Sequence, residues 1–286
     1  MARGYFVKLF LPDGDPSGLK LVEKSNWIGT GVEFPRSLYS KLKDYEHVKR
    51  AGVYILAGKE ESTQLSEVYI GEGDPIQPRL DSHIKEKEFW TQGVAFTSKD
   101  NNLNKAHIQY LEARLVQLAR EAKRCILKNA NTPQLPTLSM ADQAEMESFL
   151  DDVMLCLPTL GFNYFEVQAP TSSVAQQFRL QGKGVSAVGY ESSEGFVVRA
   201  KSQATREAAN SIHGYLKDHR TALLAQGVLT DKGFAYEFTQ DYTFSSPSTA
   251  AGVILGRSAN GRDEWKTPEG RTLKSVQESW ASTSTD

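Results

Sequence analysis

The sequence predicts an α+β fold, in which a small antiparallel sheet flanked by helices is followed by a second α+β domain. The first observation is the order of elements expected in the first half, which is strand, hairpin, helix, strand, helix. The second is a stretch at 166–173 that contains Pro-Thr-Ser-Ser and is typical of a linker. The third is size, because 286 residues with 40% hydrophobic positions can bury two cores.

These observations divide the chain into three segments. Residues 1–48 are expected to form a β-rich extension that packs on the next segment. Within it, 5–11 and 19–23 are strand-like runs around a Pro-Asp-Gly-Asp-Pro turn, and 37–47 is expected to be a short helix. Residues 49–165 are expected to form the first domain and residues 174–280 the second.

The most informative feature of the first domain is a pair of tripeptides, Gly-Val-Tyr at 52–54 and Tyr-Ile-Gly at 69–71. Each lies in a strand-like run, and the polar stretch between them is turn-like, so the pair predicts a β-hairpin. Antiparallel pairing would allow Tyr54 and Tyr69 to project from one face. A helical pattern follows the break at 71–75, and on it Arg79 and His83 lie one turn apart. Two phenols, a guanidinium and an imidazole can therefore gather at one place, which suits phosphodiester chemistry.

A strand at 94–97 and two longer helices complete the first domain. Asn104 is a candidate N-cap for a helix at 105–127. Ser139 and Asp142 resemble a capping box at the start of the second helix, which is expected to end before Pro158.

Glu112 has an unusual place on the helix at 105–127. At about 100° per residue it falls at the edge of an apolar stripe formed by Ile108, Leu111, Leu115, Ala119 and Ala122. An acid in such a stripe costs free energy unless it is paired or binds a cation. On this ground alone, a structural ion pair and a metal-ligand role are both open. A single carboxylate with waters and a substrate phosphate suits Mg²⁺ or Mn²⁺ better than zinc.

The second domain begins with strands expected at 184–190 and 195–200. A helix at 204–226 that ends at Gly227, a strand at 234–238 and a helix that opens at 246–248 follow. Trp265 lies among tight turns, and composition alone favours a place for it in the core.

The ordered set in the first domain resembles the GIY-YIG nuclease superfamily. The match comprises both tripeptides, an arginine eight residues past the last glycine, a histidine four further on and a helix-borne glutamate. It covers roughly residues 51–131, with Val53 in place of the usual isoleucine. Residues 244–273 resemble an uncharacterised C-terminal domain often fused to these nucleases, and also domains associated with adenine methylases of restriction systems. This second resemblance implies recognition of DNA or of a partner, without a second chemistry.

The resemblance implies a metal-dependent DNA endonuclease. Glu112 would hold Mg²⁺ or Mn²⁺, and Arg79 would clamp the phosphate with its planar guanidinium. Asn129 or Asn131 would correspond to an asparagine that shapes the site in the family, and the spacing does not decide between them. From 105 to 128, six basic residues stand against two acidic ones, and this local balance of +4 would steer phosphate.

The same resemblance assigns proton transfer to the tyrosines and the histidine. Tyr54 would be the general base, helped by nearby cations because a free phenol has a pKa of about 10. Tyr69 would orient the water and the phosphate. His83 would relay a proton or orient Tyr54. His107 and the remaining histidines show no metal-ligand spacing and are expected at the surface.

The competing function is that of a non-catalytic nucleic-acid-binding or regulatory protein that keeps the fold. Among nucleases, restriction or defence and DNA repair are both open. The lack of a zinc-binding cysteine set and of a helix-hairpin-helix motif favours restriction. A single active site cuts one strand at a time, so double-strand cleavage would require a homodimer or two visits.

Composition limits the setting of this activity. A formal net charge of -2 argues against bulk electrostatic adhesion to nucleic acid. No apolar run approaches the roughly 20 residues of a membrane span, and the N-terminus lacks the apolar stretch of a signal peptide. Cys125 and Cys156 stand alone in the sequence, so neither a zinc module nor a disulfide is indicated. We therefore expect no membrane partner and a cytoplasmic location.

Overall fold

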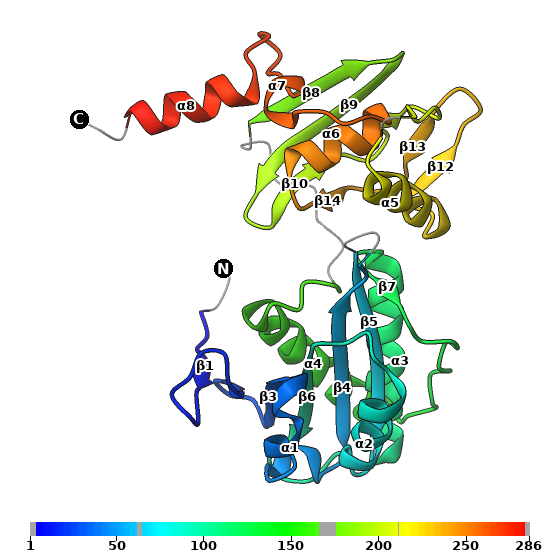
Figure 1. The fold of residues 1–286 in the computed structure, drawn as a ribbon. Helices are drawn as coiled ribbons and strands as arrows, with labels where there is room; N and C mark the ends of the chain where they lie inside the picture. The colour runs from blue at the N-terminus through cyan, green and yellow to red at the C-terminus, as the bar shows by residue number, and fades with distance from the viewer. Residues whose placement is uncertain (1–3, 62–64, 166–175, 211, 284–286) are drawn as a thin grey trace. The chain divides into compact units, whose positions relative to one another are not determined.

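The chain folds into two compact α+β units (Figure 1). Unit 1 consists of Met1–Glu60 and Ser66–Glu166, and unit 2 of Glu61–Leu65 and Val167–Asp286. The computed structural model describes residues 4–61, 65–165, 176–210 and 212–283, so the linker expected at 166–173 lies outside the described residues.

Unit 1 is built on a seven-stranded sheet with the strand order β1-β2-β3-β6-β4-β5-β7. Neighbouring strands are antiparallel, except that β5 and β7 run parallel. The predicted hairpin is formed by β4 and β5, which are both longer than expected. The strands are β1 (Val7–Phe10), β2 (Lys20–Lys24), β3 (Gly29–Pro35), β4 (Gly52–Lys59), β5 (Ser66–Gly73), β6 (Gln92–Ser98) and β7 (Ile126–Leu127).

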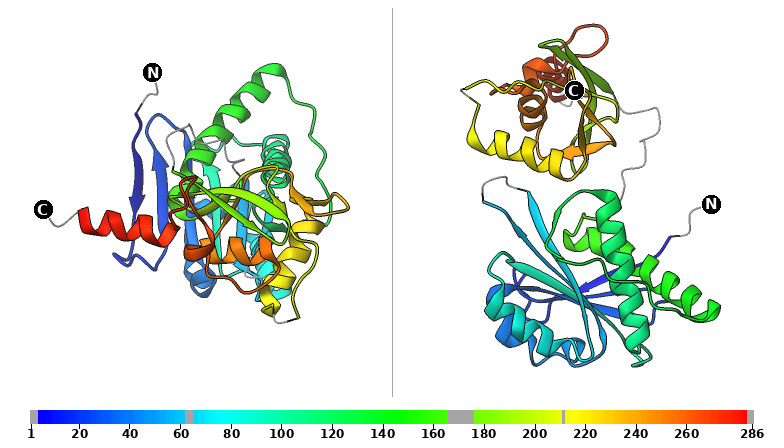
Figure 2. Two further views of the ribbon diagram at one scale, coloured as in Figure 1. Left: turned by 90° about the horizontal axis from the view of Figure 1, so that it is seen from above. Right: turned by 90° about the vertical axis from the view of Figure 1, so that its right-hand side faces the viewer.

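Helices cover both faces of this sheet (Figure 2). Successive side chains of a strand point to opposite faces, so alternate residues of β4 enter two different cores. Val53 joins the core that contains residues of α3 (Lys105–Ala122) and α4 (Met140–Cys156). Tyr54 joins the core that contains residues of α1 (Tyr39–Leu42) and α2 (Gln77–Glu86). The tyrosine of the first tripeptide therefore lies on the α2 face.

The N-terminal segment is part of the same sheet. Its third strand, β3, was not expected from the sequence, yet it pairs with β6 along its whole length. Two glycines hide its strand pattern. A Cβ at Gly29 would lie 2.1 Å from the Trp27 ring, and one at Gly31 would lie 2.7 Å from the Phe96 ring. These positions make room for aromatic side chains and so do not show the β-branched residues typical of a strand.

The long helices begin as expected, but one ends earlier. The Asn104 side chain accepts a hydrogen bond from the His107 amide, and the Ser139 side chain accepts one from the Asp142 amide. The helix expected at 105–127 stops at Ala122, because Lys123 adopts the left-handed conformation with φ 51°. Beyond it, β7 pairs with β5. At 37–47, only the four residues of α1 are α-helical, between two short 3₁₀ turns (Arg36–Leu38 and Glu46–Val48).

Unit 2 contains a four-stranded sheet with the order β14-β10-β9-β8 and a three-stranded sheet with the order β11-β13-β12. Its core includes Trp265, whose ring packs at 4.6 Å from that of Phe196, so the core position expected for this tryptophan is confirmed. The elements are β8 (Gln177–Gly182), β9 (Val185–Ser192), β10 (Gly195–Val198), β11 (Gln203–Ala204), α5 (Gly214–Ala225), β12 (Leu229–Asp231), β13 (Tyr236–Phe238), β14 (Tyr242–Phe244), α6 (Pro247–Leu255), α7 (Gly261–Glu264) and α8 (Leu273–Thr283).

The helix expected at 204–226 is wrong in its first half. Gln203 and Ala204 form β11, and the helix α5 begins only at Gly214. The buried guanidinium of Arg220 donates to the carbonyls of Thr205 and Arg206, which lie in this half. Those carbonyls are thereby satisfied without helical hydrogen bonds, so tertiary contacts override local helix propensity here.

The surface position expected for the remaining histidines is wrong for His107 and His219, which are both buried. His107 lies against the cap residue Asn104, and the His219 ring packs on the Phe244 ring. Cys125 and Cys156 are free thiols in the interior. Within the described part of the chain, no helix combines the length and the apolar character that a membrane crossing requires.

Candidate active site

The register of the central hairpin brings the two tyrosines together. Tyr54 on β4 lies opposite Gly71, and Tyr69 on β5 lies opposite Leu56, so the tyrosines are diagonal neighbours on one face. Their ring centroids are 6.3 Å apart. A Cβ at Gly71 would lie 2.3 Å from the Tyr54 hydroxyl oxygen. The glycine of the second tripeptide therefore makes room for the phenol of the first.

His83 on α2 is the hydrogen-bond partner of Tyr54. Its Nε2 lies 2.7 Å from the Tyr54 hydroxyl oxygen, and both side chains are buried. Burial, together with the positive charges of Lys87 and Arg79, lowers the pKa of His83 to about 4. A neutral imidazole carries its proton on one ring nitrogen only, and in the tautomer with the proton on Nδ1 the His83 Nε2 accepts from the Tyr54 hydroxyl.

Arg79 joins the tyrosines from one turn earlier on α2. Its guanidinium hydrogen-bonds to the phenolic oxygens of both Tyr54 and Tyr69. Tyr54 is fully buried, Tyr69 is half-buried and Arg79 is exposed, so the cluster opens to solvent on the arginine side. Burial raises the pKa of Tyr54 far above its usual range despite the nearby guanidinium, and the phenol therefore keeps its proton at neutral pH.

Glu112 reaches this cluster from α3. Burial, and next the carboxylate of Glu72, raise the pKa of Glu112 to about 7, while Arg79 and Lys105 oppose the shift. After burial, the negative charge of Glu112 also contributes to raising the pKa of both tyrosines. Tyr54, Tyr69, Arg79 and His83 therefore contact one another, and Glu112 on α3 is coupled to this group through its charge.

Glu72 is the acidic residue that sequence reasoning missed. It directly follows the last glycine of the Tyr-Ile-Gly tripeptide, and both of its carboxylate oxygens accept from Lys105 Nζ, at 2.6 and 2.8 Å. The signal was available, because strand alternation places Glu72 on the same face as Ile70, which is the face covered by α3. Lys87 was also missed, and its ammonium lies 4.6 Å from the centroid of the Tyr69 ring.

Asn129 lies beside the hairpin and is bonded to its second strand. The Asn129 side chain accepts from the Ile70 amide at 3.0 Å and donates to the Ile70 carbonyl at 2.8 Å. It thus continues the edge pairing of β7, which ends at Val68 on β5. Asn131 is exposed. Because Ile70 stands between Tyr69 and Gly71, Asn129 holds the strand that carries the second tripeptide.

Three of the six basic residues at 105–128 form ion pairs with residues outside that stretch. Lys105, Arg114 and Lys128 each pair with a glutamate of a neighbouring element at 2.6 to 2.8 Å. The local positive charge expected to steer phosphate is therefore partly offset by glutamates of neighbouring elements. A pocket of about 540 Å³ lies at the same end of the hairpin and shares Lys105 with the site; it is lined by Glu46, Lys49, Arg50, Ala51, Asp74, Asn101, Leu103, Asn104 and Lys105.

The carboxylates of the site fit a hard divalent cation with few protein ligands. Among the residues that the structure describes, no group of three or more His, Cys, Asp or Glu is arranged to hold a metal. Mg²⁺ is usually bound through one or two carboxylates, with waters and substrate phosphates completing its shell. Burial, and next the negative charge of Glu72, favour the protonated form of Glu112, and a bound cation would compensate the charge of both carboxylates. The donor set therefore suits Mg²⁺ or Mn²⁺ and does not form a closed zinc site.

Comparison with known proteins reaches only unit 2. Residues 178–277 match a family described as a domain of unknown function (DUF4357). No GIY-YIG family matches the chain. No curated protein and no solved structure matches the chain either. The family match spans about a third of the chain and lies entirely within unit 2.

Proposed function

We propose that unit 1 is a metal-dependent endonuclease that hydrolyses phosphodiester bonds of DNA, with the GIY-YIG type of active site. The observation that carries the proposal is the Tyr54–His83 hydrogen bond of 2.7 Å. Beside it, the Arg79 guanidinium hydrogen-bonds to the phenols of both Tyr54 and Tyr69. An exposed guanidinium next to buried proton-carrying groups is suited to hold a phosphodiester while a proton is removed beside it.

The buried tyrosine acts as part of a proton relay. The reacting water lies at the pair of hydroxyls of Tyr54 and Tyr69, of which Tyr69 is the more exposed. As the water loses a proton to the phenol pair, Tyr54 passes its own proton to Nε2 of His83. The low pKa of His83 keeps Nε2 unprotonated at neutral pH, and because the high pKa of Tyr54 disfavours a free phenolate, the phenol gives up its proton only as it takes one from the water. The resulting hydroxide attacks phosphorus, and the bond to the leaving oxygen breaks.

The other groups of the site stabilise charge. Arg79 donates to the phosphoryl oxygens, where a planar, permanently charged guanidinium is most effective. Glu112, with Glu72 near it, would hold Mg²⁺ or Mn²⁺, which as a Lewis acid stabilises charge on the phosphoryl and leaving oxygens. Lys105 pairs with Glu72 and offsets its charge.

The proposed biological setting is restriction or defence, with DNA repair as the other nuclease role. Unit 2 would select the substrate, and a homodimer would allow both strands to be cut. We place this activity in the cytoplasm, because free interior thiols such as Cys125 and Cys156 suit a reducing compartment.

The test is cleavage of supercoiled plasmid, methylated DNA, branched DNA and single strands, with Mg²⁺ or Mn²⁺. The expected result is cutting that is abolished by Glu112→Ala, with DNA binding retained, and that is also abolished by Arg79→Ala. Glu145→Ala is the matched control, because Glu145 is exposed on α4 away from the site. Normal cutting by Glu112→Ala would reject the metal assignment. Binding without cutting of any substrate would reject the nuclease in favour of a non-catalytic reader.

A further inference from the structure

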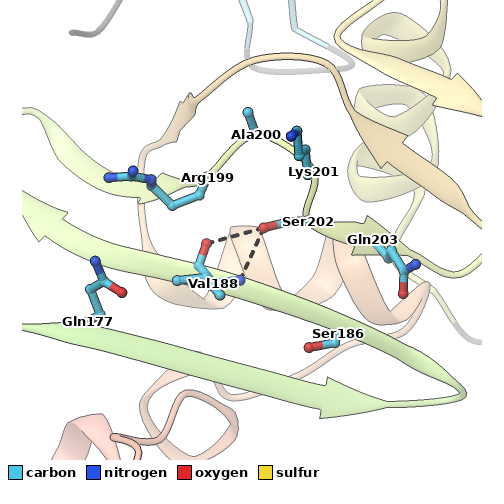
Figure 3. Close-up of a pocket in the computed structure, with 8 residues that line it drawn as sticks. All are labelled: Gln177, Ser186, Val188, Arg199, Ala200, Lys201, Ser202 and Gln203. Atoms are coloured by element: carbon cyan, nitrogen blue, oxygen red, sulfur yellow. Dashed lines mark hydrogen bonds between the residues drawn. The ribbon is translucent and has the colours of Figure 1, made fainter. Parts of the chain in front are cut away.

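Unit 2 contains a polar pocket of about 490 Å³ on its four-stranded sheet (Figure 3). Its walls come from β8, β9 and the segment that leads from β10 to β11. The lining residues are Gln177, Ser186, Val188, Arg199, Ala200, Lys201, Ser202 and Gln203. The volume falls in the range of about 300 to 1,000 Å³ typical of small-ligand sites.

The pocket offers hydrogen-bond donors that have no partner. Among the described residues, the side chains of Gln177, Ser186, Lys201 and Gln203 make no hydrogen bond or ion pair. Ser202 is different, because its hydroxyl accepts from the Val188 amide and donates to the Val188 carbonyl (Figure 3). Ser202 therefore holds the wall in place, while the other polar side chains are available to a ligand.

The charge of the lining is positive. Arg199 and Lys201 are its only ionisable members. Asp241 pairs with the Arg199 guanidinium at 3.6 Å and accepts from the Ala200 amide, so it offsets one positive charge. Lys201 remains as an unpaired ammonium among the described residues. The ligand that complements an ammonium, a guanidinium, two amides and a hydroxyl is an anion with further polar edges.

Lys201 is held in a conformation that its residue type rarely adopts. Its φ is 67°, in the left-handed region, which is unfavourable for a residue with a Cβ. The Lys201 amide is bonded to the Phe238 carbonyl and the Ser202 amide to the Arg199 carbonyl, so the bend is fixed. Backbone amides are thus occupied, and a ligand would be met by side chains.

We propose that this pocket binds a phosphate group of a nucleic-acid strand, with Lys201 as its principal charge contact. Lysine, arginine, glutamine and serine side chains are among the groups that contact phosphate and sugar oxygens in protein–DNA complexes. Gln177, Gln203 and Ser186 would hold the attached sugar or the edge of a base. The proposal rests on the proposed function for its choice of a polynucleotide over a free phosphate compound, and it gives unit 2 a defined contact with the substrate.

The experiment measures binding of a short fluorescent DNA duplex and single strand by the full chain in EDTA, where metal-dependent cutting is absent. Lys201→Gln is compared with Lys183→Gln. Lys183 is the matched control because it is also an exposed lysine of unit 2 in the left-handed region, with φ 50°, but lies outside the pocket. We expect Lys201→Gln to raise the Kd about fivefold to tenfold and to reduce the salt slope of binding by about one.

The controls separate this inference from the proposed function. Equal binding by both variants and wild type would overturn the pocket assignment even if the chain cuts DNA. Lys201-dependent binding without any cutting would support the pocket while the nuclease proposal fails. Competition by inorganic phosphate or a mononucleotide as strong as that by DNA, at equal phosphate concentration, would overturn the polynucleotide as ligand.

Discussion

The hydroxyl of Tyr54 has two roles that can be measured separately, one in proton transfer and one in the stability of the fold. Tyr54→Phe keeps the buried ring and removes the donor to His83, so the relay is broken. We expect the cleavage rate to fall by about 10²- to 10⁴-fold. The free energy of unfolding should fall by only about 1 kcal/mol, which is typical of one lost hydrogen bond. Single-turnover cleavage and urea unfolding measure the two effects.

Tyr39→Phe is the matched control for that variant. Its hydroxyl donates to Asp81 on α2 at 2.9 Å, so the change also removes a tyrosine hydrogen bond to the same helix. It should lose a similar amount of stability and keep its cleavage rate. Equal rates for both variants would remove Tyr54 from the relay.

The raised pKa of Glu112 predicts a pH-dependent loss of stability in the metal-free protein. The folded state holds this proton up to about pH 7, against an ordinary value of 4.5. The resulting stabilisation is fully present below the ordinary value and is lost as pH rises through about 7. From about pH 5 to about pH 8, wild type should lose on the order of 1 kcal/mol relative to Glu112→Gln, a figure reduced for solvent screening.

Urea unfolding of both proteins in EDTA at the two pH values measures this difference. The depressed pKa of His83 acts in the opposite direction, since its contribution is present above pH 6.5 and is lost as pH falls through about 4. His83 is unchanged in the variant, so its contribution largely cancels in the comparison. Parallel pH profiles of wild type and Glu112→Gln would show that Glu112 titrates normally.

At the scale of residues, the sequence predicts the site wherever spacing alone brings groups together. Arg79 and His83 follow from one turn of helix, and Tyr54 and Tyr69 from a hairpin register. For Glu72, strand alternation gives the face on which it lies, but its role follows only once α3 packs over that face. Spacing also does not decide whether Asn129 or Asn131 belongs to the site. The hydrogen bonds of Asn129 to Ile70 at the edge of β5 distinguish the two.

At the scale of elements, Asn129 replaces a strand residue at the edge of β5. Asn129→Ala would leave the Ile70 amide and carbonyl without their partner, and should destabilise this edge by about 1 to 3 kcal/mol. Hydrogen exchange at the Ile70 amide should become faster, and cleavage should slow because the strand carries Tyr69. Asn131→Ala, two residues away and exposed, should leave both unchanged. Unaltered exchange at Ile70 in Asn129→Ala would contradict this role.

Elements with a strong local pattern are the ones that the sequence predicts. The hairpin, β6 and the starts of α3 and α4 follow from strand-like runs and capping side chains. Two short elements, β7 and β11, pair over two residues each and carry no pattern of their own. β3 is concealed by its glycines. The first half of the helix expected at 204–226 is wrong because buried Arg220 satisfies carbonyls there, a contact that no local rule anticipates.

At the scale of the whole molecule, the two units have separate hydrophobic cores. We therefore expect calorimetry to resolve more than one unfolding transition. Leu223→Ala, in the core of unit 2, should lower the stability of one transition by about 2 to 5 kcal/mol. Leu115→Ala, in the core of unit 1, should lower the other by a similar amount. A single transition shifted by both variants would show that the units unfold together.

The sequence suggests two units from size and from the composition of 166–173, but it does not show how the N-terminal segment is used. Strand-like runs at 5–11 and 19–23 are compatible with a separate extension. The pairing of β3 with β6 makes them the outer part of one seven-stranded sheet. Strand order depends on pairing between distant segments, which local patterns do not encode.

The close approach of Gly71 to the Tyr54 hydroxyl constrains how this site can change during evolution. Any side chain at position 71 would displace the phenol, so a larger residue there becomes tolerable only after position 54 has become smaller. The reverse order, loss of the tyrosine first, carries no steric penalty at Gly71. Among descendants of this chain, Gly71 should therefore persist longer than Tyr54. Inactive copies should keep the Tyr-Ile-Gly tripeptide while the tyrosine of Gly-Val-Tyr is replaced.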